Sequence, residues 1–113
     1  ANLRENDHYY HFIPLGDGWY KIAFKQSGRL VLDVAGGRNN NGVAIQAYED
    51  NGTAAQRFRF RRTSDGLYMI FTYWGRAIST QRSDAQDGVV HTWEELPDNH
   101  RDMKNQLWRL VKP

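Results

Sequence analysis

Apolar and polar residues alternate along most of this chain, over short spans separated by clusters of glycine, asparagine and aspartate. Alternation with a period of two is typical of strands, and the intervening clusters favour turns. No stretch keeps a helical period, so residues 97–106 are predicted to form a loop or at most one helical turn. We therefore predict an all-β protein with strands over 8–14, 19–25, 30–34, 43–48, 56–62, 67–73, 77–81, 89–94 and 105–111.

The strand pattern repeats itself once along the chain. Four landmarks recur in the same order, each about 45 to 50 residues after its first occurrence. They are the Asp-Gly-x-Tyr-x-Ile or related segments at 17–22 and 65–70, the Gly-Arg pairs at 28–29 and 75–76, the aromatic pair Tyr48 and Trp93, and the pair Gln56 and Gln106. Offsets that differ only by loop-sized insertions indicate two copies of one four-strand unit.

The first residues extend the repeat. His8 and Phe12 precede Gly18 by the same spacing as Gln56 and Phe60 precede Gly66. Residues 8–12 are therefore predicted to be the last strand of a further unit whose first three strands are missing from this sequence.

The repeat resembles the ricin-type β-trefoil family, which includes the ricin-B-like lectins and the family 13 carbohydrate-binding modules. The resemblance covers residues 8–111 and is closest in four segments: "GWYKI" at 18–22, "SGRLVLDV" at 27–34, "NGVAIQAY" at 41–48 and "QRF" at 56–58. It implies one β-trefoil domain over 1–113, with 8–16 as the last strand of the first repeat, 17–62 as the second repeat and 63–111 as the third.

The resemblance also implies a core. In this fold the Gln-x-aromatic strands place one aromatic residue each at the barrel floor, which here gives Tyr10, Phe58 and Trp108. Strand alternation predicts that neighbouring apolar residues also point inward and that the intervening arginines point outward. The inward set adds Phe12, Phe60 and Leu110, and the outward set is Arg57, Arg59 and Arg109.

A trefoil needs twelve strands, and the sequence predicts about nine. An incomplete barrel leaves an exposed edge and an exposed part of its core. We therefore expect another chain or fragment, or a second copy of this chain, to supply the remaining segment of roughly 35–40 residues.

The resemblance places a carbohydrate-binding site in the first complete repeat. A sugar needs hydrogen-bond partners for its hydroxyls and an aromatic face for its ring. The predicted site residues are Asp33 as acceptor, Gln46 as the group that holds the carboxylate or the backbone in place, Tyr48 as the aromatic platform, Asn51 or Asp50 from the following loop, and Gln56. Family members often have asparagine where this chain has Ala55. Alternatively, Asp33 and Tyr48 only stabilise a turn and a hairpin, and Gln56 only braces the backbone.

A second, weaker site is expected in the other complete repeat. Its residues are His91, Trp93, Asn105 and Gln106, but Ser79 stands where the aspartate is expected. A hydroxyl is a poorer acceptor for two sugar hydroxyls than a carboxylate, so a purely structural hairpin remains an alternative here.

Composition and charge exclude several other functions. The chain has no cysteine, which excludes disulfides, thiolate metal sites and cysteine nucleophiles. Its formal charge is only +2, and alternation separates the arginines of 57–62 from the phenylalanines, which argues against nucleic-acid binding. The same arginines could still attract sialylated or sulfated glycans. The sequence has no apolar run of bilayer length, and its polar N-terminal residues are unlike a signal peptide.

The remaining polar residues show no catalytic or metal-binding spacing. The four histidines lack zinc-ligand spacing, and the acidic pairs Glu49-Asp50 and Glu94-Glu95 are adjacent rather than opposed across a cleft. No nucleophile elbow or phosphate-binding loop occurs, and the glycine-rich segment 35–42 is predicted to be a turn. We expect no enzyme activity, no metal and no cofactor.

The sequence therefore predicts a non-catalytic lectin module, the glycan-docking part of a secreted toxin or agglutinin. Its expected partners are glycans, of galactose type or acidic, and the chain that completes the trefoil; nucleic acid and membrane insertion are not expected. The alternative is a trefoil that has lost sugar binding and acts as a structural or protein-interaction subunit.

Overall fold

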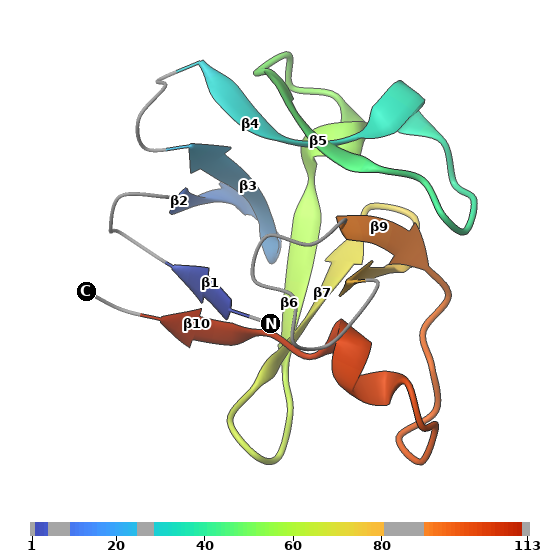
Figure 1. Cartoon of the computed structure of the whole chain (residues 1–113). Coiled ribbons are helices and arrows are strands. Elements are labelled where there is room, and N and C mark those ends of the chain that lie inside the picture. The colour runs from blue at the N-terminus through green and yellow to red at the C-terminus, as the bar shows by residue number, and fades with distance from the viewer. Residues whose placement is uncertain (1, 5–9, 25–28, 81–89, 112–113) are drawn as a thin grey trace.

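A computed structural model describes residues 2–4, 10–24, 29–80 and 90–111. Over these ranges the chain forms ten strands and three short 3-10 helices, arranged as one eight-stranded sheet and one pair of strands (Figure 1). The strands are β1 (Asn2–Arg4), β2 (Tyr10–Gly16), β3 (Trp19–Phe24), β4 (Leu30–Val34), β5 (Ile45–Glu49), β6 (Phe58–Arg62), β7 (Tyr68–Thr72), β8 (Ala77–Thr80), β9 (Val90–Trp93) and β10 (Arg109–Val111). The helices are η1 (Ala35–Gly37), η2 (Ala54–Gln56) and η3 (Met103–Gln106).

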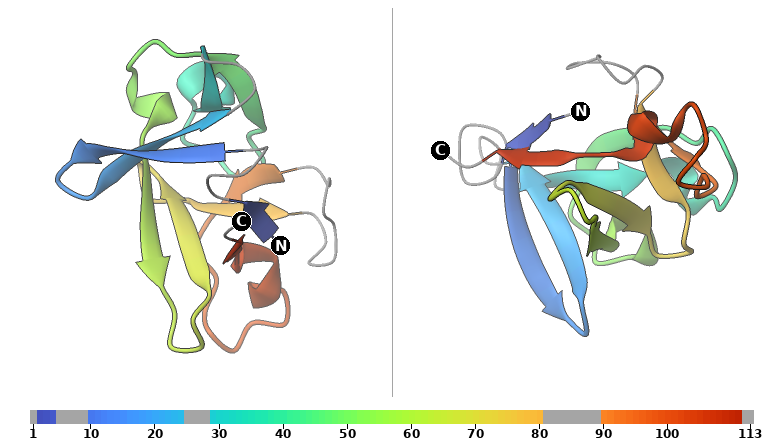
Figure 2. Two further views of the ribbon diagram at one scale, coloured as in Figure 1. Left: turned by 90° about the vertical axis from the view of Figure 1, so that its left-hand side faces the viewer. Right: turned by 90° about the horizontal axis from the view of Figure 1, so that it is seen from below.

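The pairing of the strands follows the predicted repeat. The large sheet has the order β5-β4-β3-β6-β7-β8-β9, and β2 pairs with β3 beside this path. The β4–β5 hairpin matches the β8–β9 hairpin in register, since Asp33 pairs with Gln46 and Ser79 pairs with His91. The β2–β3 and β6–β7 hairpins project from the body in different directions (Figure 2). The all-β class and the trefoil-like repeat are confirmed.

The three aromatic residues predicted for the barrel floor pack in one core cluster. Phe58 and Trp108 are buried, and the partly buried Tyr10 packs against them. Phe12 and Phe60 join the same cluster, with their ring centroids 5.3 Å apart. This confirms the inward set, except for Leu110, whose side chain lies outside the described part of the structure.

The outward set is also confirmed: Arg57, Arg59 and Arg109 are all exposed. Alternating directions along β6 therefore separate its arginines from Phe58 and Phe60, as predicted.

The two glutamines that mark the repeat do not lie in strands. We predicted strands beginning at 56 and 105, but Gln56 ends η2 and Gln106 ends η3. Both side chains form hydrogen bonds with backbone groups of the preceding segment. These hydrogen bonds favour a tight turn at each glutamine over an extended strand. The loop prediction for 97–106 is confirmed, with η3 as its single helical turn.

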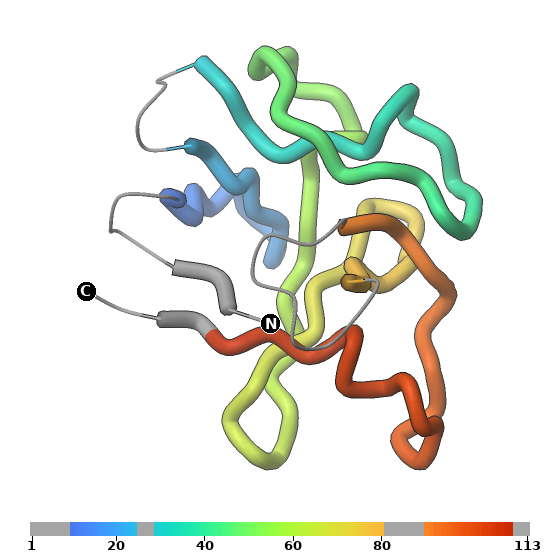
Figure 3. The backbone as a smooth tube through the Cα atoms, viewed as in Figure 1, coloured from blue at the N-terminus to red at the C-terminus, as the bar shows by residue number. Residues whose placement is uncertain are grey.

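Other differences are small. Strand β1 was not predicted; it pairs in parallel with β10 (Figure 1). Figure 3 traces the same backbone as a tube without the strand arrows. Residues 8, 9, 25, 81 and 89 of the predicted strands lie outside the described ranges. The turn predicted at 35–42 begins with η1, where Gly36 and Gly37 have left-handed backbone angles, φ 66° and 63°.

Residues 39–43 join the two complete repeats through Thr92 of β9. The Thr92 amide donates to the Val43 carbonyl at 2.9 Å, and its hydroxyl donates to the Asn40 carbonyl at 2.5 Å. Arg76 adds hydrogen bonds to the side chains of Asn39 and Asn41, the former at 2.9 Å from Nε. These bonds fix the 39–43 loop against the next repeat.

None of the helices in the described ranges has the length or apolar character that crossing a bilayer requires. The structure contains a single chain, so completion of the trefoil by another chain or copy stays a prediction.

Candidate functional site

A pocket of about 400 Å³ lies beside the β4–β5 hairpin. Four segments line it: the end of β4 with η1, the strand β5, the loop that leads into η2, and the turn between β7 and β8. The lining residues are Asp33, Gly36, Gly37, Gln46, Tyr48, Asn51, Thr53, Ala54, Ala55 and Trp74. The pocket therefore combines one carboxylate with two aromatic rings from different repeats.

The Asp33 carboxylate is held by two glutamines. Gln46 Nε2 donates to Oδ1 at 3.0 Å, and Gln56 Nε2 donates to Oδ2 at 2.9 Å. The residue is 5% exposed, so these bonds fix the direction of both oxygens. An ionised carboxylate oxygen accepts about two hydrogen bonds. Each oxygen therefore keeps capacity for a ligand donor, which suits two neighbouring hydroxyls.

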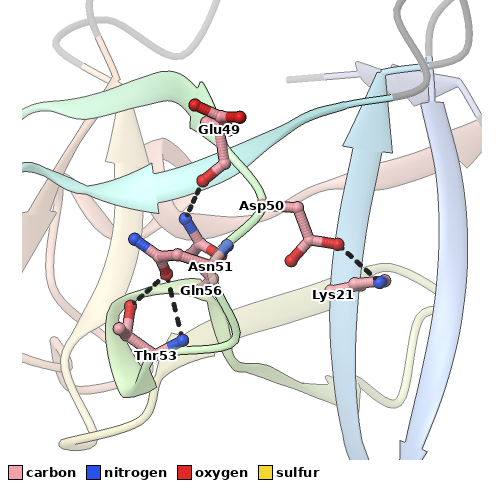
Figure 4. A network of polar contacts seen from close by, with 6 residues as sticks. All are labelled: Lys21, Glu49, Asp50, Asn51, Thr53 and Gln56. Atoms are coloured by element: carbon pink, nitrogen blue, oxygen red, sulfur yellow. Dashed lines mark hydrogen bonds and ion pairs between the residues drawn. The ribbon is translucent and has the colours of Figure 1, made fainter.

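Gln56 supports the pocket from below rather than lining it. Its side chain is buried, and its Nε2 also donates to the Glu49 carbonyl at 2.9 Å. Its Oε1 accepts from the Asn51 amide at 2.9 Å, so all its hydrogen-bonding groups have partners within the chain (Figure 4). Gln56 thus holds both the Asp33 carboxylate and the following loop, and its own contact with a sugar stays a prediction.

Of the two loop residues considered, Asn51 lines the pocket. Its Oδ1 accepts from the amide of Thr53 at 3.1 Å and from the Thr53 hydroxyl at 2.7 Å. This leaves the Asn51 Nδ2 group as a donor. Asp50 instead forms an ion pair with Lys21 of β3 at 2.7 Å and is absent from the pocket lining (Figure 4).

Trp74 is a pocket residue that sequence reasoning missed. It lies in the turn between β7 and β8, and the repeat pattern assigned no role to that turn. A Cβ atom built on Gly37 would lie 4.0 Å from Trp74 Cη2, so the indole lies close to the η1 backbone. One feature of the sequence could have indicated this role. Trp74 stands between two predicted strands, in the segment "Tyr-Trp-Gly" at 73–75, where packing of the core does not require a tryptophan.

One wall of the pocket is formed in part by Ala55, the position where the sequence departs from the family pattern. Ala55 is buried and lines the pocket where family members often have asparagine. Its methyl group contributes apolar surface and no hydrogen bond. Polar contact with a ligand is therefore left to the other lining residues, Asp33, Gln46 and Asn51 among them.

A second pocket, of about 500 Å³, occupies the matching place in the other repeat. Ser79 is buried where the first pocket has its carboxylate, and Trp93 is 39% exposed like Tyr48 at 51%. The structure brings His91, Trp93 and Asn105 together here, while Gln106 is fully buried beneath them. The lining residues are Ser79, Thr80, His91, Trp93, Glu94, Leu96, His100, Asp102 and Asn105.

His91 has the ordinary environment of a half-buried imidazole. Burial lowers the pKa of His91 below the usual 6.5, because desolvation disfavours the charged ring. Its ring lies edge to face with Trp93, with centroids 6.0 Å apart. At neutral pH the second pocket therefore has an uncharged ring at the position that matches Gln46 and a hydroxyl at the position that matches Asp33.

Within the described ranges, no group of three histidine, cysteine, aspartate or glutamate residues is placed to hold a metal ion. The groups that line both pockets include hydrogen-bonding side chains and exposed aromatic rings.

Comparison with known proteins agrees with the fold. Residues 5–93 match the model of the ricin-type β-trefoil lectin domain-like family, and the chain belongs to this family. A search of curated proteins finds no match.

Solved structures give the same result. A designed threefold-symmetric protein, ThreeFoil, is similar with a TM-score of 0.78 and 29% identity, over 90% of this chain and 70% of that one. An exo-β-1,3-galactanase from Clostridium thermocellum gives a TM-score of 0.76 and 29% identity over 90% of this chain. A Polyporus squamosus lectin, solved with a human-type influenza-binding epitope, gives 0.73 and 22% over 88%. The chain spans only 21% of the galactanase and 34% of that lectin.

Proposed function

We propose that this chain is a non-catalytic carbohydrate-binding module that takes one sugar ring in the Asp33 pocket. The observation that carries the proposal is the Asp33 carboxylate, fixed by Gln46 and Gln56 beside the exposed rings of Tyr48 and Trp74. Sugar rings present vicinal hydroxyls on one edge and C–H groups on their faces. Fixed acceptors next to aromatic faces match both features.

The family and its structural relatives support this proposal. The matching family model describes a lectin-like domain, and two of the similar structures are a galactanase and a lectin. We therefore propose glycans, with galactose-type sugars first, as ligands. An extracellular location and a docking role beside a toxin or agglutinin partner fit the same proposal.

Sugar binding in one open pocket is expected to be weak. Modules of this kind reach useful strength by engaging several sugars at once. The second pocket, where Ser79 replaces the carboxylate, is proposed as the weaker of the two sites.

The test is a glycan array followed by titration with the best sugar. Asp33→Asn and Tyr48→Ala are expected to weaken binding by roughly tenfold or more, because each removes an interaction of about 1.4 kcal/mol or more. Trp74→Ala is expected to behave like Tyr48→Ala. Trp93→Ala is the matched control for the strong site, because it removes an exposed ring from the weaker pocket and should leave the affinity of the Asp33 pocket unchanged.

The rival function is a protein-interaction or structural subunit without sugar binding. Ala55 and Ser79 favour it, because both replace polar groups that a sugar site would use. A folded protein that binds no sugar on the array would support the rival and overturn the lectin proposal.

We also propose that a partner completes the trefoil. The chain corresponds to 70% of a designed threefold-symmetric protein, which leaves room for further strands. A native mass above 13.2 kDa is expected in sedimentation experiments. A strict monomer that unfolds cooperatively would contradict completion but would leave the Asp33 pocket proposal standing.

A further inference from the structure

Next to the Asp33 pocket, four side chains form a continuous surface that we call the aromatic ridge: Trp19, Arg59, Tyr73 and Trp74. The ring of Trp74 lies 5.9 Å from that of Tyr73, edge to face, and the ring of Tyr73 lies 5.1 Å from that of Trp19. The guanidinium carbon of Arg59 lies 4.2 Å from the centre of the Trp19 ring. Trp74 also lines the Asp33 pocket, so the ridge begins inside that site and leads away from it.

The strand register brings these residues to one face. Arg59 of β6 pairs with Phe71 of β7, and side chains two apart on a strand point the same way. The side chain of Tyr73, which comes directly after β7, therefore points to the same face of the sheet as those of Phe71 and Arg59. Trp19 reaches the same face from β3, since the residue after it, Tyr20, pairs with Phe58 of β6.

The ridge is accessible, and the core does not need it. Tyr73 is 44% exposed and Trp74 is 36% exposed. Neither residue belongs to the core clusters formed by the described residues. Exposed aromatic rings in contact with one another are unusual on a surface without a ligand, because burying them would gain free energy.

The ridge also carries positive charge that no acid among the described residues neutralises. Lys21 is paired with Asp50, and Arg61 is paired with Glu95. Among the described residues, no carboxylate forms an ion pair with Arg59 or with the neighbouring Arg57. An anion bound beside Trp19 would therefore meet cations that are not already neutralised.

Arg59 carries the donors that such an anion needs. Its guanidinium carbon lies over the ring of Trp19, and the guanidinium group has five N–H donors. These donors fit the two oxygens of a carboxylate or sulfate. Stacking on Trp19 also restrains the side chain, which lowers the entropy lost on binding.

We propose that the aromatic ridge is a second subsite of the Asp33 pocket and binds the anionic residue of an acidic oligosaccharide. The neutral ring of the ligand lies in the pocket between Tyr48 and Trp74. The chain then follows Tyr73 and Trp19 to Arg59, which binds a carboxylate or sulfate. This inference rests on the proposed sugar binding and deepens it by naming the class of glycan.

The test compares matched pairs of glycans: a neutral oligosaccharide, the same chain ending in sialic acid, and the same chain bearing a sulfate. At about 0.05 M salt the wild-type protein is expected to bind the anionic member roughly tenfold more tightly than the neutral one. The preference is expected to shrink at about 0.5 M salt, where exposed charges are screened. A preference for the sialylated or the sulfated chain identifies the source of the anion, and either supports the proposal.

The variants separate the ridge from bulk charge. Arg59→Gln is expected to abolish the preference for the anionic glycan and to leave affinity for the neutral glycan within about twofold. Arg59→Lys keeps the positive charge but loses the pair of N–H donors that binds two oxygens at once. Part of the preference for the anionic glycan is therefore expected to remain. The matched control is Arg62→Gln, which removes the same charge from an exposed position on the other face of β6.

Two results would overturn the inference. If the wild-type protein binds neutral and anionic chains equally and Asp33→Asn still weakens binding, the ridge subsite is wrong while the pocket stands. If Arg59→Gln and Arg62→Gln reduce the preference equally, the effect comes from net charge and not from the ridge. Absence of binding to any glycan by the folded protein would overturn both this inference and the proposed function.

Discussion

Gln56 and Gln106 make the same two backbone hydrogen bonds in the two complete repeats. Gln56 donates to the Glu49 carbonyl and accepts from the Asn51 amide, while Gln106 donates to the Glu94 carbonyl and accepts from the Leu96 amide. The difference is the third partner. Gln56 also donates to the Asp33 carboxylate. In the repeat of Gln106, Ser79 stands at the position that corresponds to Asp33.

This difference predicts unequal effects of removing the two side chains. Gln56→Leu is expected to destabilise the protein by about 3 kcal/mol and Gln106→Leu by about 2 kcal/mol, because the first also deprives a buried carboxylate of a donor. Urea unfolding at neutral pH measures both values. Equal losses would show that the bond from Gln56 to Asp33 contributes nothing to stability.

A second prediction concerns the contact between repeats. Asn41 Oδ1 accepts from the Glu94 amide at 2.8 Å and from Arg76, so it joins the loop of one repeat to two elements of the next. Asn41→Ala is expected to cost about 1 to 2 kcal/mol, although the residue is exposed. Thermal or urea unfolding provides the measurement.

Asn40 provides the control for this prediction. Only its backbone carbonyl takes part in the contact, as the acceptor of the Thr92 hydroxyl. Asn40→Ala should therefore leave stability within about 0.5 kcal/mol of the wild type, as expected for a surface substitution. A similar loss in both variants would point to loop conformation rather than to the Asn41 bonds.

The sequence predicted the architecture because the architecture is repetitive. The similar spacings from Gly18 to Gln56 and from Gly66 to Gln106, 38 and 40 residues, could be read directly, and alternation separated Phe58 from Arg59. The glutamines themselves were placed in strands, because local alternation cannot show a side chain that bonds to a loop. Strand β1 was not predicted, because its partner, β10, lies about a hundred residues away in the sequence.

The site was only partly predictable for a related reason. Asp33, Gln46, Tyr48 and Asn51 belong to one repeat, so its motif could name them together. Trp74 reaches the same pocket from the following repeat. Its contribution depends on how two repeats pack, which a motif within one repeat does not contain.

A third prediction concerns pH. Because burial lowers the pKa of His91 below 6.5, the folded state binds its proton less readily than the unfolded state does. The stabilising contribution of the neutral ring is present above pH 6.5 and is lost as the pH falls below that value toward the folded-state pKa. Unfolding free energies at pH 7.5 and pH 5.5 should differ less in His91→Gln than in the wild type. Equal pH dependence in both proteins would contradict the prediction.

The final prediction is a gain of binding in the second pocket. Among the described residues, Gln106 Nε2 donates only to the Glu94 carbonyl, so its other hydrogen is available for the acceptor that Asp33 provides in the first repeat. Ser79→Asp places a carboxylate at the matching register, beside Trp93 and Asn105. We expect the stoichiometry of strong sugar binding to rise from one to two per chain, measured by calorimetric titration.

Two variants make this result specific. Ser79→Asn adds similar volume without a second acceptor oxygen or a charge, so it should leave the stoichiometry at one. Asp33→Asn combined with Ser79→Asp should leave one strong site, now in the second pocket. If Ser79→Asp folds with wild-type stability and still binds one sugar, the carboxylate is not the group that distinguishes the two pockets. The difference would then lie in His91, which replaces the amide of Gln46 with a ring.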